Sequence, residues 1–378
     1  MARLRMGMVG GGNDAFIGNV HRIASRIDDR FELVAGALSS SAEKSAASAE
    51  ALNLPRSYAN YIEMAKAEAS RDDGIQVVSI VTPNHVHADA AIAFLSQGIH
   101  VVCDKPLTST LEDARRLEDA ITESKALFVL THNYTGYPMI RQARAMVESG
   151  TLGDIRIVQA EYPQDWLTTP VEKEGLKQAE WRTDPKRSGA GGSIGDIGTH
   201  AHNLACFVSG LTVESLAADL QTFGTGRSLD DNAHIMLRFA GGARGLLWCS
   251  QVAPGNENGL KLRVYGDKGG LEWKQEDPNY LWFTEHGKPR QLITRSGAGA
   301  MDAANNLSRI PPGHPEGYLE GFANIYTEVA QAVEAMQGGN SRHEVMGLLP
   351  GITEGMAGML FIHACVESSK GNSAWVNL

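Results

Sequence analysis

Residues 76–106 read QVVSIVTPNHVHADAAIAFLSQGIHVVCDKP, and this stretch decides the fold. Two short β-branched runs, Val77–Val81 and Ile99–Val102, flank a helix-length segment, which predicts a βαβ unit with parallel strands. Each strand leads into a polar turn that contains proline, Thr82-Pro83-Asn84 and Asp104-Lys105-Pro106. Ligands of open α/β sheets bind outside the carboxyl ends of the strands. The sequence therefore marks Lys105 as a candidate for chemistry.

The same alternation of strand and helix extends over residues 1–131. A strand at Leu4–Val9 runs into glycines and a helix, a second strand follows at Phe31–Leu38, and the last comes at Leu127–Leu130. Strands that alternate with helices predict an α/β fold whose first domain is a doubly wound parallel sheet of the Rossmann type.

Residues 132–378 show a different pattern of expected helices and strands. After a helix at Met139–Ser149 come longer strands with alternating side chains, which are typical of an antiparallel sheet with one open face. We therefore expect a second, α+β domain with a large, mostly antiparallel, open-faced sheet. Residues 296–317 are rich in Gly, Asn and Pro, and a loop of that length is usually functional or mobile. The expected strands are Ile155–Tyr162, Val213–Thr222, Asn232–Phe239, Ala243–Gln251, Lys261–Gly266, Gly270–Lys274 and Tyr280–Thr284.

Composition narrows the class of protein. The chain has 378 residues, 43% of them hydrophobic and 21% charged, which suits a globular protein of two domains. The net charge of −10 argues against nucleic acid as a partner, because a basic field for phosphates is lacking. The four cysteines form no Cys-x-x-Cys pair, so reduced thiols in a cytoplasmic protein are expected. No apolar run approaches the length of a membrane span, and neither a signal peptide nor a membrane partner is expected.

Gly10-Gly11-Gly12 follows the first strand and precedes a helix, which is the position of a dinucleotide-binding loop. Glycines there let the backbone approach a pyrophosphate, which the helix N-terminus then stabilises. Two spacings are open. Gly10-x-Gly12-x-x-Ala15 fits the fingerprint directly, whereas Gly18 as the third glycine makes the loop about three residues longer. The longer loop adds Phe16 and Ile17 to the expected cofactor contacts.

The end of the second strand bears on the choice of cofactor. The acid that would bind a ribose 2′-hydroxyl is missing there, and Ala37-Leu38-Ser39-Ser40 takes its place. Small hydroxyls such as that of Ser39, with Lys44 nearby, would accept a 2′-phosphate. This favours NADP, while NAD stays open.

A second dense region lies around residues 189–204. Asp196, His200 and Asn203 are spaced so that they share one face of a helix. A carboxylate one turn from an imidazole orients it and supports its charged form. Gly195 and Gly198 cost helix stability but let a flat ligand approach the backbone. The alternative is an ordinary buried helix in which the Asp–His pair is structural.

With these motifs the chain resembles the Gfo/Idh/MocA family, which includes glucose–fructose oxidoreductase and inositol dehydrogenase. The resemblance implies a dinucleotide-binding domain, residues 1–131, and a substrate-binding domain, residues 132–378, whose open sheet packs in homodimers or homotetramers. It also implies hydride transfer between NAD or NADP and a secondary hydroxyl or ketone of a sugar, cyclitol or related polyol. The motifs that carry it are the glycine loop, Thr82-Pro83-Asn84 with His87, Asp104-Lys105-Pro106, Trp181-Arg182 and Asp196-x-x-x-His200.

By this resemblance Lys105, Asp196 and His200 are the catalytic residues, and no metal ion is expected. His200 would accept the hydroxyl proton during oxidation, Asp196 would stabilise the imidazolium, and Lys105 would stabilise the developing alkoxide. The expected substrate contacts are Lys105, Tyr134, Trp166, Trp181, Arg182, Asp196, His200 and His314. The expected cofactor contacts are Gly10, Gly12, Phe16, Ile17, Ser39, Lys44, Thr82, Pro83, Asn84, His87, Asp104, Lys105 and Pro106.

The chain departs from the family pattern at several positions. Asp104 stands where a Glu is usual, which keeps the charge but shortens the reach. Asn203 replaces a common Asp on the same helix face, so a substrate hydroxyl there would be bound differently. The enlarged glycine loop leaves the pose of the cofactor open.

Other functions stay open as well. A non-catalytic, dinucleotide-sensing regulator of the same fold would be expected to lose the lysine or the histidine, and both are present. A metal-dependent enzyme would use His85, His87, His200 and His202, but carboxylate–histidine motifs are lacking. NAD-assisted oxidation of a glycoside, followed by elimination or hydrolysis, would give net reaction without net NADH.

Overall fold

The computed structural model describes residues 3–13, 15–175 and 177–378, and these fall into two compact units. The first unit comprises the described parts of Met1–Asn133 together with Phe322–Ala357. The second comprises those of Tyr134–Gly321 together with Gly358–Leu378. The chain thus returns to the first unit late in the sequence. The domain boundary expected at residue 131 does not include this return, because the return depends on tertiary contacts that sequence patterns do not show.

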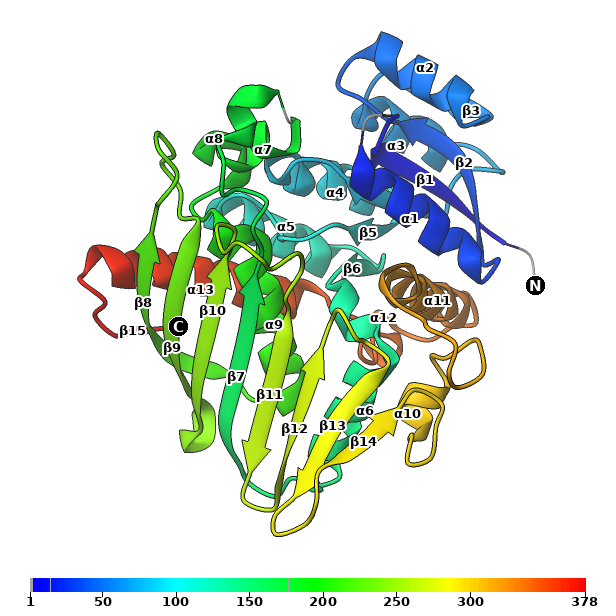
Figure 1. The fold of residues 1–378 in the computed structure, drawn as a ribbon. Helices are drawn as coiled ribbons and strands as arrows, with labels where there is room; N and C mark the ends of the chain where they lie inside the picture. Colours follow the sequence, from blue (N-terminus) through cyan, green and yellow to red (C-terminus); the bar gives the residue numbers. More distant parts are fainter. Residues whose placement is uncertain (1–2, 14, 176) are drawn as a thin grey trace. The chain divides into compact units, whose positions relative to one another are not determined.

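The first unit is built on a parallel sheet with strand order β3-β2-β1-β4-β5-β6 (Figure 1). All neighbouring strands pair in parallel, which confirms the doubly wound arrangement. The strand order reverses between β1 and β4, and ligands bind at such a switch point. The strands are β1 Leu4–Gly10, β2 Phe31–Ala37, β3 Arg56–Ser57, β4 Val77–Val81, β5 His100–Cys103 and β6 Phe128–Leu130. The helices are α1 Phe16–Ile27, α2 Ala42–Ala51, α3 Tyr61–Ala69, η1 Asn84–Val86, α4 His87–Leu95, α5 Leu111–Glu123, α12 Arg342–Val345 and most of α11 Tyr318–Gln337.

The core of this unit explains why the chain returns to it. Every residue of β4 is buried, as expected for a central parallel strand that is covered on both faces. The hydroxyl of Tyr326 in α11 lies 2.8 Å from Nδ1 of His21 and 2.9 Å from Oγ of Ser79. All three side chains are buried, so α11 is held by polar contacts inside the core as well as by apolar packing.

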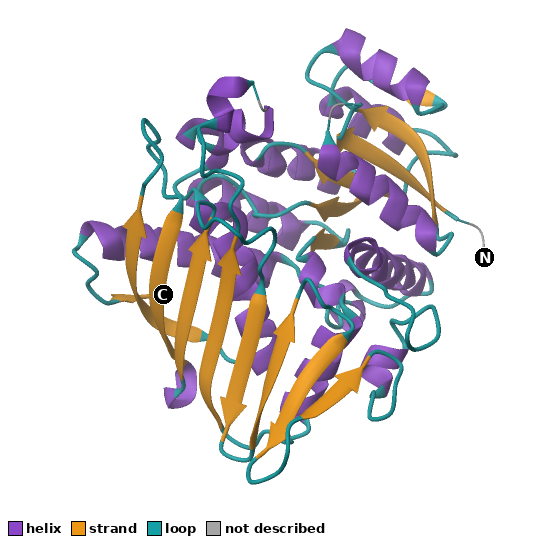
Figure 2. Ribbon diagram, in the orientation of Figure 1, coloured by secondary structure: helices purple, strands orange, loops and turns teal. Residues whose placement is uncertain are grey.

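The second unit is built on a larger sheet with strand order β14-β13-β12-β11-β7-β10-β9-β8-β15. Among the described strands of this sheet only β7 and β10 pair in parallel, which confirms a mostly antiparallel sheet. Helices α6 and α9 pack on one face (Figure 2). Alternate residues of β9 on the other face, His234, Met236 and Arg238, are exposed.

The remaining bounds complete this unit. Its strands are β7 Ile155–Pro163, β8 Val213–Gln221, β9 Asn232–Phe239, β10 Arg244–Ser250, β11 Lys261–Gly266, β12 Gly269–Lys274, β13 Tyr280–Glu285, β14 Gln291–Thr294 and β15 Val376–Asn377. Its helices are η2 Asn133–Gly136, α6 Pro138–Glu148, η3 Val171–Glu174, α7 Lys177–Arg182, α8 Pro185–Ser188, η4 Ile194–Gly198, α9 Thr199–Ser209, η5 Ala240–Gly242, α10 Asp302–Asn305 and most of α13 Ile352–Lys370.

Candidate active site

The glycine loop adopts a backbone conformation that glycine takes up most easily. Gly10 and Gly11 have φ values of 76° and 71°, which residues with a Cβ rarely adopt. Gly18 packs so closely on the loop that a Cβ there would collide with the Cα of Gly11. Gly18 therefore occupies the place of the third glycine in the longer spacing. Phe16 and Ile17, expected as cofactor contacts of a longer loop, begin α1, where Phe16 is 61% exposed and Ile17 packs against the apolar core.

The buried guanidinium of Arg22 supports the same loop by a hydrogen bond. Nη1 of Arg22, in α1, donates a hydrogen bond to the carbonyl oxygen of Gly11 and lies 3.7 Å from Sδ of Met8. Burial lowers the pKa of this guanidinium. We did not predict this contact, and the available signal was an arginine on the buried face of the first helix.

The turn after β2 is ordered by its serines. The hydroxyl of Ser39 accepts a hydrogen bond from the backbone N–H of Ser41 at 3.2 Å. The hydroxyl of Ser41 in turn accepts from the N–H of Lys44 at 3.4 Å and begins α2. The Lys44 side chain is exposed, so it is available to a ligand at this turn.

His87 ties together the turns that follow β4 and β5. Its Nε2 lies 2.9 Å from the carbonyl oxygen of Thr82, and its Nδ1 lies 2.9 Å from that of Pro106. The ring is buried, and burial is the main cause that lowers its pKa. His87 therefore shapes the predicted cofactor wall through backbone carbonyls. Asn84, in the same wall, is also buried.

Asp104 supports the main chain of Lys105. Its Oδ1 accepts hydrogen bonds from the N–H of Lys105 at 3.0 Å and from the hydroxyl of Thr131 at 2.8 Å. The Asp104 carboxylate is bonded to Thr131, directly after β6, and it thus fixes the backbone of Lys105 after β5. The shorter Asp side chain suits this role, since its acceptor must reach the next backbone N–H.

Asp196 lies in η4, a π-helical turn of a kind that is frequent at functional sites. Its Oδ2 accepts hydrogen bonds from Nε of Arg182 at 3.2 Å and from Nε2 of Gln251 at 2.9 Å. The Arg182 guanidinium lies 4.3 Å from the centre of the Trp181 ring. Trp181, Arg182 and Asp196, all expected substrate contacts, thus lie in one cluster, and the structure adds Gln251, which sequence reasoning missed.

The turn that carries Asp196 is anchored by a buried carboxylate, Asp230. Its oxygens accept hydrogen bonds from the N–H of Gly192 at 2.6 Å, the hydroxyl of Ser193 at 2.6 Å and the N–H of Ile194 at 2.9 Å. Burial outweighs these bonds and raises the pKa of Asp230. An anion at this place also stabilises the positive end of the helical segment. The only signal in the sequence was an Asp two residues before a strand.

His200, in α9, is buried against aromatic rings. The ring centres of Tyr134 and His200 are 4.9 Å apart, and those of Tyr162 and His200 are 6.2 Å apart. Tyr134, a predicted substrate contact, is buried, with its hydroxyl 2.5 Å from that of Tyr162. Trp166 is half-buried and donates from Nε1 to Oε1 of Gln164 at 3.1 Å.

His314 belongs to a different cluster. Its carbonyl oxygen accepts a hydrogen bond from Nη2 of Arg295 at 2.5 Å. Arg295 forms an ion pair of 3.0 Å with Glu316, and both side chains are 2% exposed. The loop of residues 296–317 is therefore anchored at its end by a buried ion pair, while the His314 residue itself is exposed.

Comparison with known proteins identifies the family. Residues 4–132 match the model of an oxidoreductase family with an NAD-binding Rossmann fold, and residues 140–272 match that of a GFO/IDH/MocA C-terminal domain. The crystal structure of an oxidoreductase from Sinorhizobium meliloti is 59% identical over the whole of both chains, with a TM-score of 0.90. The protein belongs to the Gfo/Idh/MocA oxidoreductase family.

Two further relatives agree with this membership. The oxidoreductase YfiI of Bacillus subtilis is 35% identical over 99% of this chain and 96% of its own. An inositol dehydrogenase homologue from Azotobacter vinelandii, solved with NAD+, is 37% identical over 100% of this chain and 97% of its own, with a TM-score of 0.94. As a member of the family this protein is an oxidoreductase with an NAD-binding Rossmann fold, as predicted.

Within residues 3–13, 15–175 and 177–378, no group of His, Cys, Asp or Glu side chains is arranged to hold a metal ion. The helices of the described chain include none that is long and apolar enough to cross a membrane.

Proposed function

We propose that the protein oxidises or reduces a secondary alcohol of a sugar, cyclitol or related polyol with a nicotinamide dinucleotide. The observation that carries the proposal is the Asp196 cluster, in which Arg182 and Gln251 hold a carboxylate on the helical segment that also bears His200. A family relative from Azotobacter vinelandii, 36% identical, has been solved with NADH and myo-inositol. That relative supports a polyhydroxylated ring as the substrate class.

The residues divide the chemistry among them. The dinucleotide supplies or accepts the hydride when it is bound, and the glycine loop and the His87-tied turns would hold it. His200 accepts the hydroxyl proton in the oxidation direction, and the Asp196 carboxylate stabilises the resulting imidazolium. Lys105, fixed through Asp104, stabilises the negative charge that develops on the same oxygen.

The test is a reduced-nicotinamide absorbance screen over sugars and inositols, run with NAD and NADP separately. The proposal predicts turnover with at least one polyol. Dinucleotide binding without turnover across the whole panel would instead favour a sensing role. A net reaction without net NADH would favour oxidation followed by elimination.

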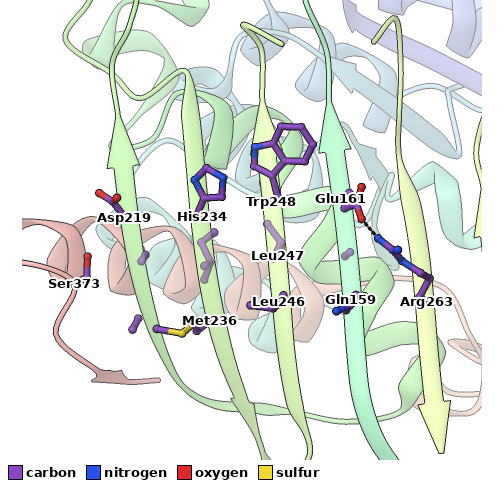
Figure 3. A pocket seen from close by; sticks show the side chains of 14 residues that line it. Gln159, Glu161, Asp219, His234, Met236, Leu246, Leu247, Trp248, Arg263 and Ser373 are labelled. Carbon is purple, nitrogen blue, oxygen red and sulfur yellow. Dashed lines mark ion pairs between the residues drawn. The ribbon is translucent and has the colours of Figure 1, made fainter. Parts of the chain in front are cut away.

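We further propose that a second copy of the chain covers the open face of the larger sheet, as a homodimer or within a homotetramer. Side chains of β7 to β11, together with Ser373, line a hollow of about 700 Å³ on this face (Figure 3). Met236 and Leu246 are 48% and 52% exposed, which is unusual for a surface that stays in water. Asp219 and Arg263, the latter paired with Glu161, give the face both signs of charge. Such a face can match itself about a twofold axis.

A further inference from the structure

A hydrogen-bonded pair of tyrosines lies against the His200 ring. Tyr134 comes from η2 and Tyr162 from the end of β7, so different elements position them. Their side chains are buried, with residues only 4% and 3% exposed, and their hydroxyl oxygens are 2.5 Å apart. Both rings contact the His200 ring, Tyr134 in a T-shaped arrangement at 4.9 Å and Tyr162 at 6.2 Å.

The direction of the hydrogen bonds in this cluster follows from Asn258. Its Nδ2 donates to Oε1 of Gln275 at 2.9 Å, so its Oδ1 is the acceptor for the hydroxyl of Tyr162 at 2.8 Å. A hydroxyl has one proton, and that of Tyr162 is used here. Tyr134 must therefore donate to the oxygen of Tyr162. Rotating either ring would leave a buried polar group unsatisfied, so the chain of bonds fixes both rings.

We propose that Tyr134 and Tyr162 position the imidazole of His200 for proton transfer. The inference rests on the proposed function, in which His200 is the base. A general base works only within hydrogen-bond reach of its proton and in the correct orientation, and rings packed against the imidazole limit its rotation.

The tyrosines act through packing rather than as acids or bases. Burial raises the pKa of Tyr134 and of Tyr162, so both hydroxyls stay protonated at neutral pH. They are positioning residues, and their effect must appear in the behaviour of His200.

The chain offers a matched control in Tyr137. It is 1% exposed, its ring packs on those of Tyr134 and Trp273, and its hydroxyl accepts from Nε2 of Gln275 at 3.4 Å. Tyr137→Phe thus removes a buried hydroxyl from the same network, but from a ring other than the two that pack on His200. The Tyr137→Phe variant therefore shows how the protein changes when the hydrogen-bond network alone is loosened.

The first readout is NMR of histidine labelled with ¹⁵N in the ring, which needs no substrate. The His200 signals are assigned by their loss in His200→Ala. We expect Tyr134→Phe and Tyr162→Phe to shift the titration midpoint of His200 and to broaden its signals, whereas Tyr137→Phe leaves both near those of the unaltered protein. Thermal unfolding of each variant shows that it is folded.

The second readout is turnover with the best polyol of the screen. Tyr134→Phe and Tyr162→Phe should each lower kcat by about 10- to 100-fold and shift its pH profile, with KM for the dinucleotide unchanged. The inference is overturned if both variants match Tyr137→Phe in the His200 titration and in the pH profile. Full activity of His200→Ala is a different result, since it contradicts the proposed function and leaves the NMR comparison to decide the positioning.

Discussion

At the scale of single residues, polar side chains with defined partners hold the backbone of the candidate site in place. Asp104 illustrates this, because its departure from the family's usual Glu looked like a loss of reach. The structure shows the carboxylate bonded to the N–H of Lys105 and to Thr131, so the shorter side chain serves the backbone. Arg22 serves the glycine loop in the same way, through the carbonyl of Gly11.

Buried histidines make stability depend on pH. Burial lowers the pKa of His21 and of His202 to about 4 each, against 6.5 for an unperturbed side chain. Between these values the unfolded chain binds more protons than the folded one, so the free energy of unfolding falls as the pH falls through this window. We expect a loss on the order of 3 kcal/mol per histidine, measured by urea unfolding from about pH 7 to 4.

The variant His202→Gln should flatten this dependence, because its side chain takes up no proton. His286→Gln, which alters an exposed histidine, should leave it unchanged. Parallel curves for His202→Gln and the unaltered protein would contradict the assignment.

At the scale of elements, the sequence predicted local structure better than it predicted contacts between distant residues. The βαβ unit at residues 76–106 and the polar turns after its strands follow from periodicity and proline, and both are found. The sequence could not reveal that Asp230 anchors η4, that Gln251 binds Asp196 or that Tyr162 contacts His200. Each of those partners lies more than thirty residues away and depends on how the larger sheet folds. The catalytic and cofactor roles of the predicted residues stay predictions.

Asp230→Asn tests the anchor of η4. The amide would place a donor opposite the donors of Gly192, Ser193 or Ile194, and we expect a loss of about 1–3 kcal/mol in the free energy of unfolding. We also expect slower turnover, because Asp196 would lose its fixed position. Asp72→Asn, at an exposed residue, is the control in both measurements. A variant as stable and active as this control would show that the anchor is dispensable.

We propose that the turn after β2 selects the 2′ group of the cofactor. If Ser39 and Lys44 favour NADP as predicted, Ser39→Asp should raise KM for NADP at least about tenfold by repelling its phosphate, and KM for NAD should change less. Steady-state kinetics with both dinucleotides measures this. Equal effects on the two would show that Ser39 does not face the 2′ position.

At the scale of the whole molecule, one feature could not be predicted from sequence patterns and another could. The return of residues 322–357 to the first unit depends on tertiary contacts such as that of Tyr326 with His21. The alternating strands did predict an open sheet face, and the exposed Met236 and Leu246 on it are the basis for the proposed second copy.

Leu246→Lys should weaken that self-association, because a charge replaces an apolar side chain at the centre of the face. Size-exclusion chromatography with light scattering should then report a smaller assembly than for the unaltered protein. Leu348→Lys, at an exposed leucine of the first unit, should have no effect. If the unaltered protein is already a monomer, the proposed oligomer is wrong.

The central proposal is that His200 and Lys105 both act in hydride transfer. Single-turnover hydride transfer, followed by nicotinamide absorbance, tests it most directly in His200→Ala and Lys105→Ala, with His286→Ala and Lys125→Ala as exposed controls. We predict that each active-site variant slows the transfer by at least about a hundredfold, while its affinity for the dinucleotide stays within a few-fold and the controls are unchanged. Normal hydride transfer in either active-site variant would contradict the account.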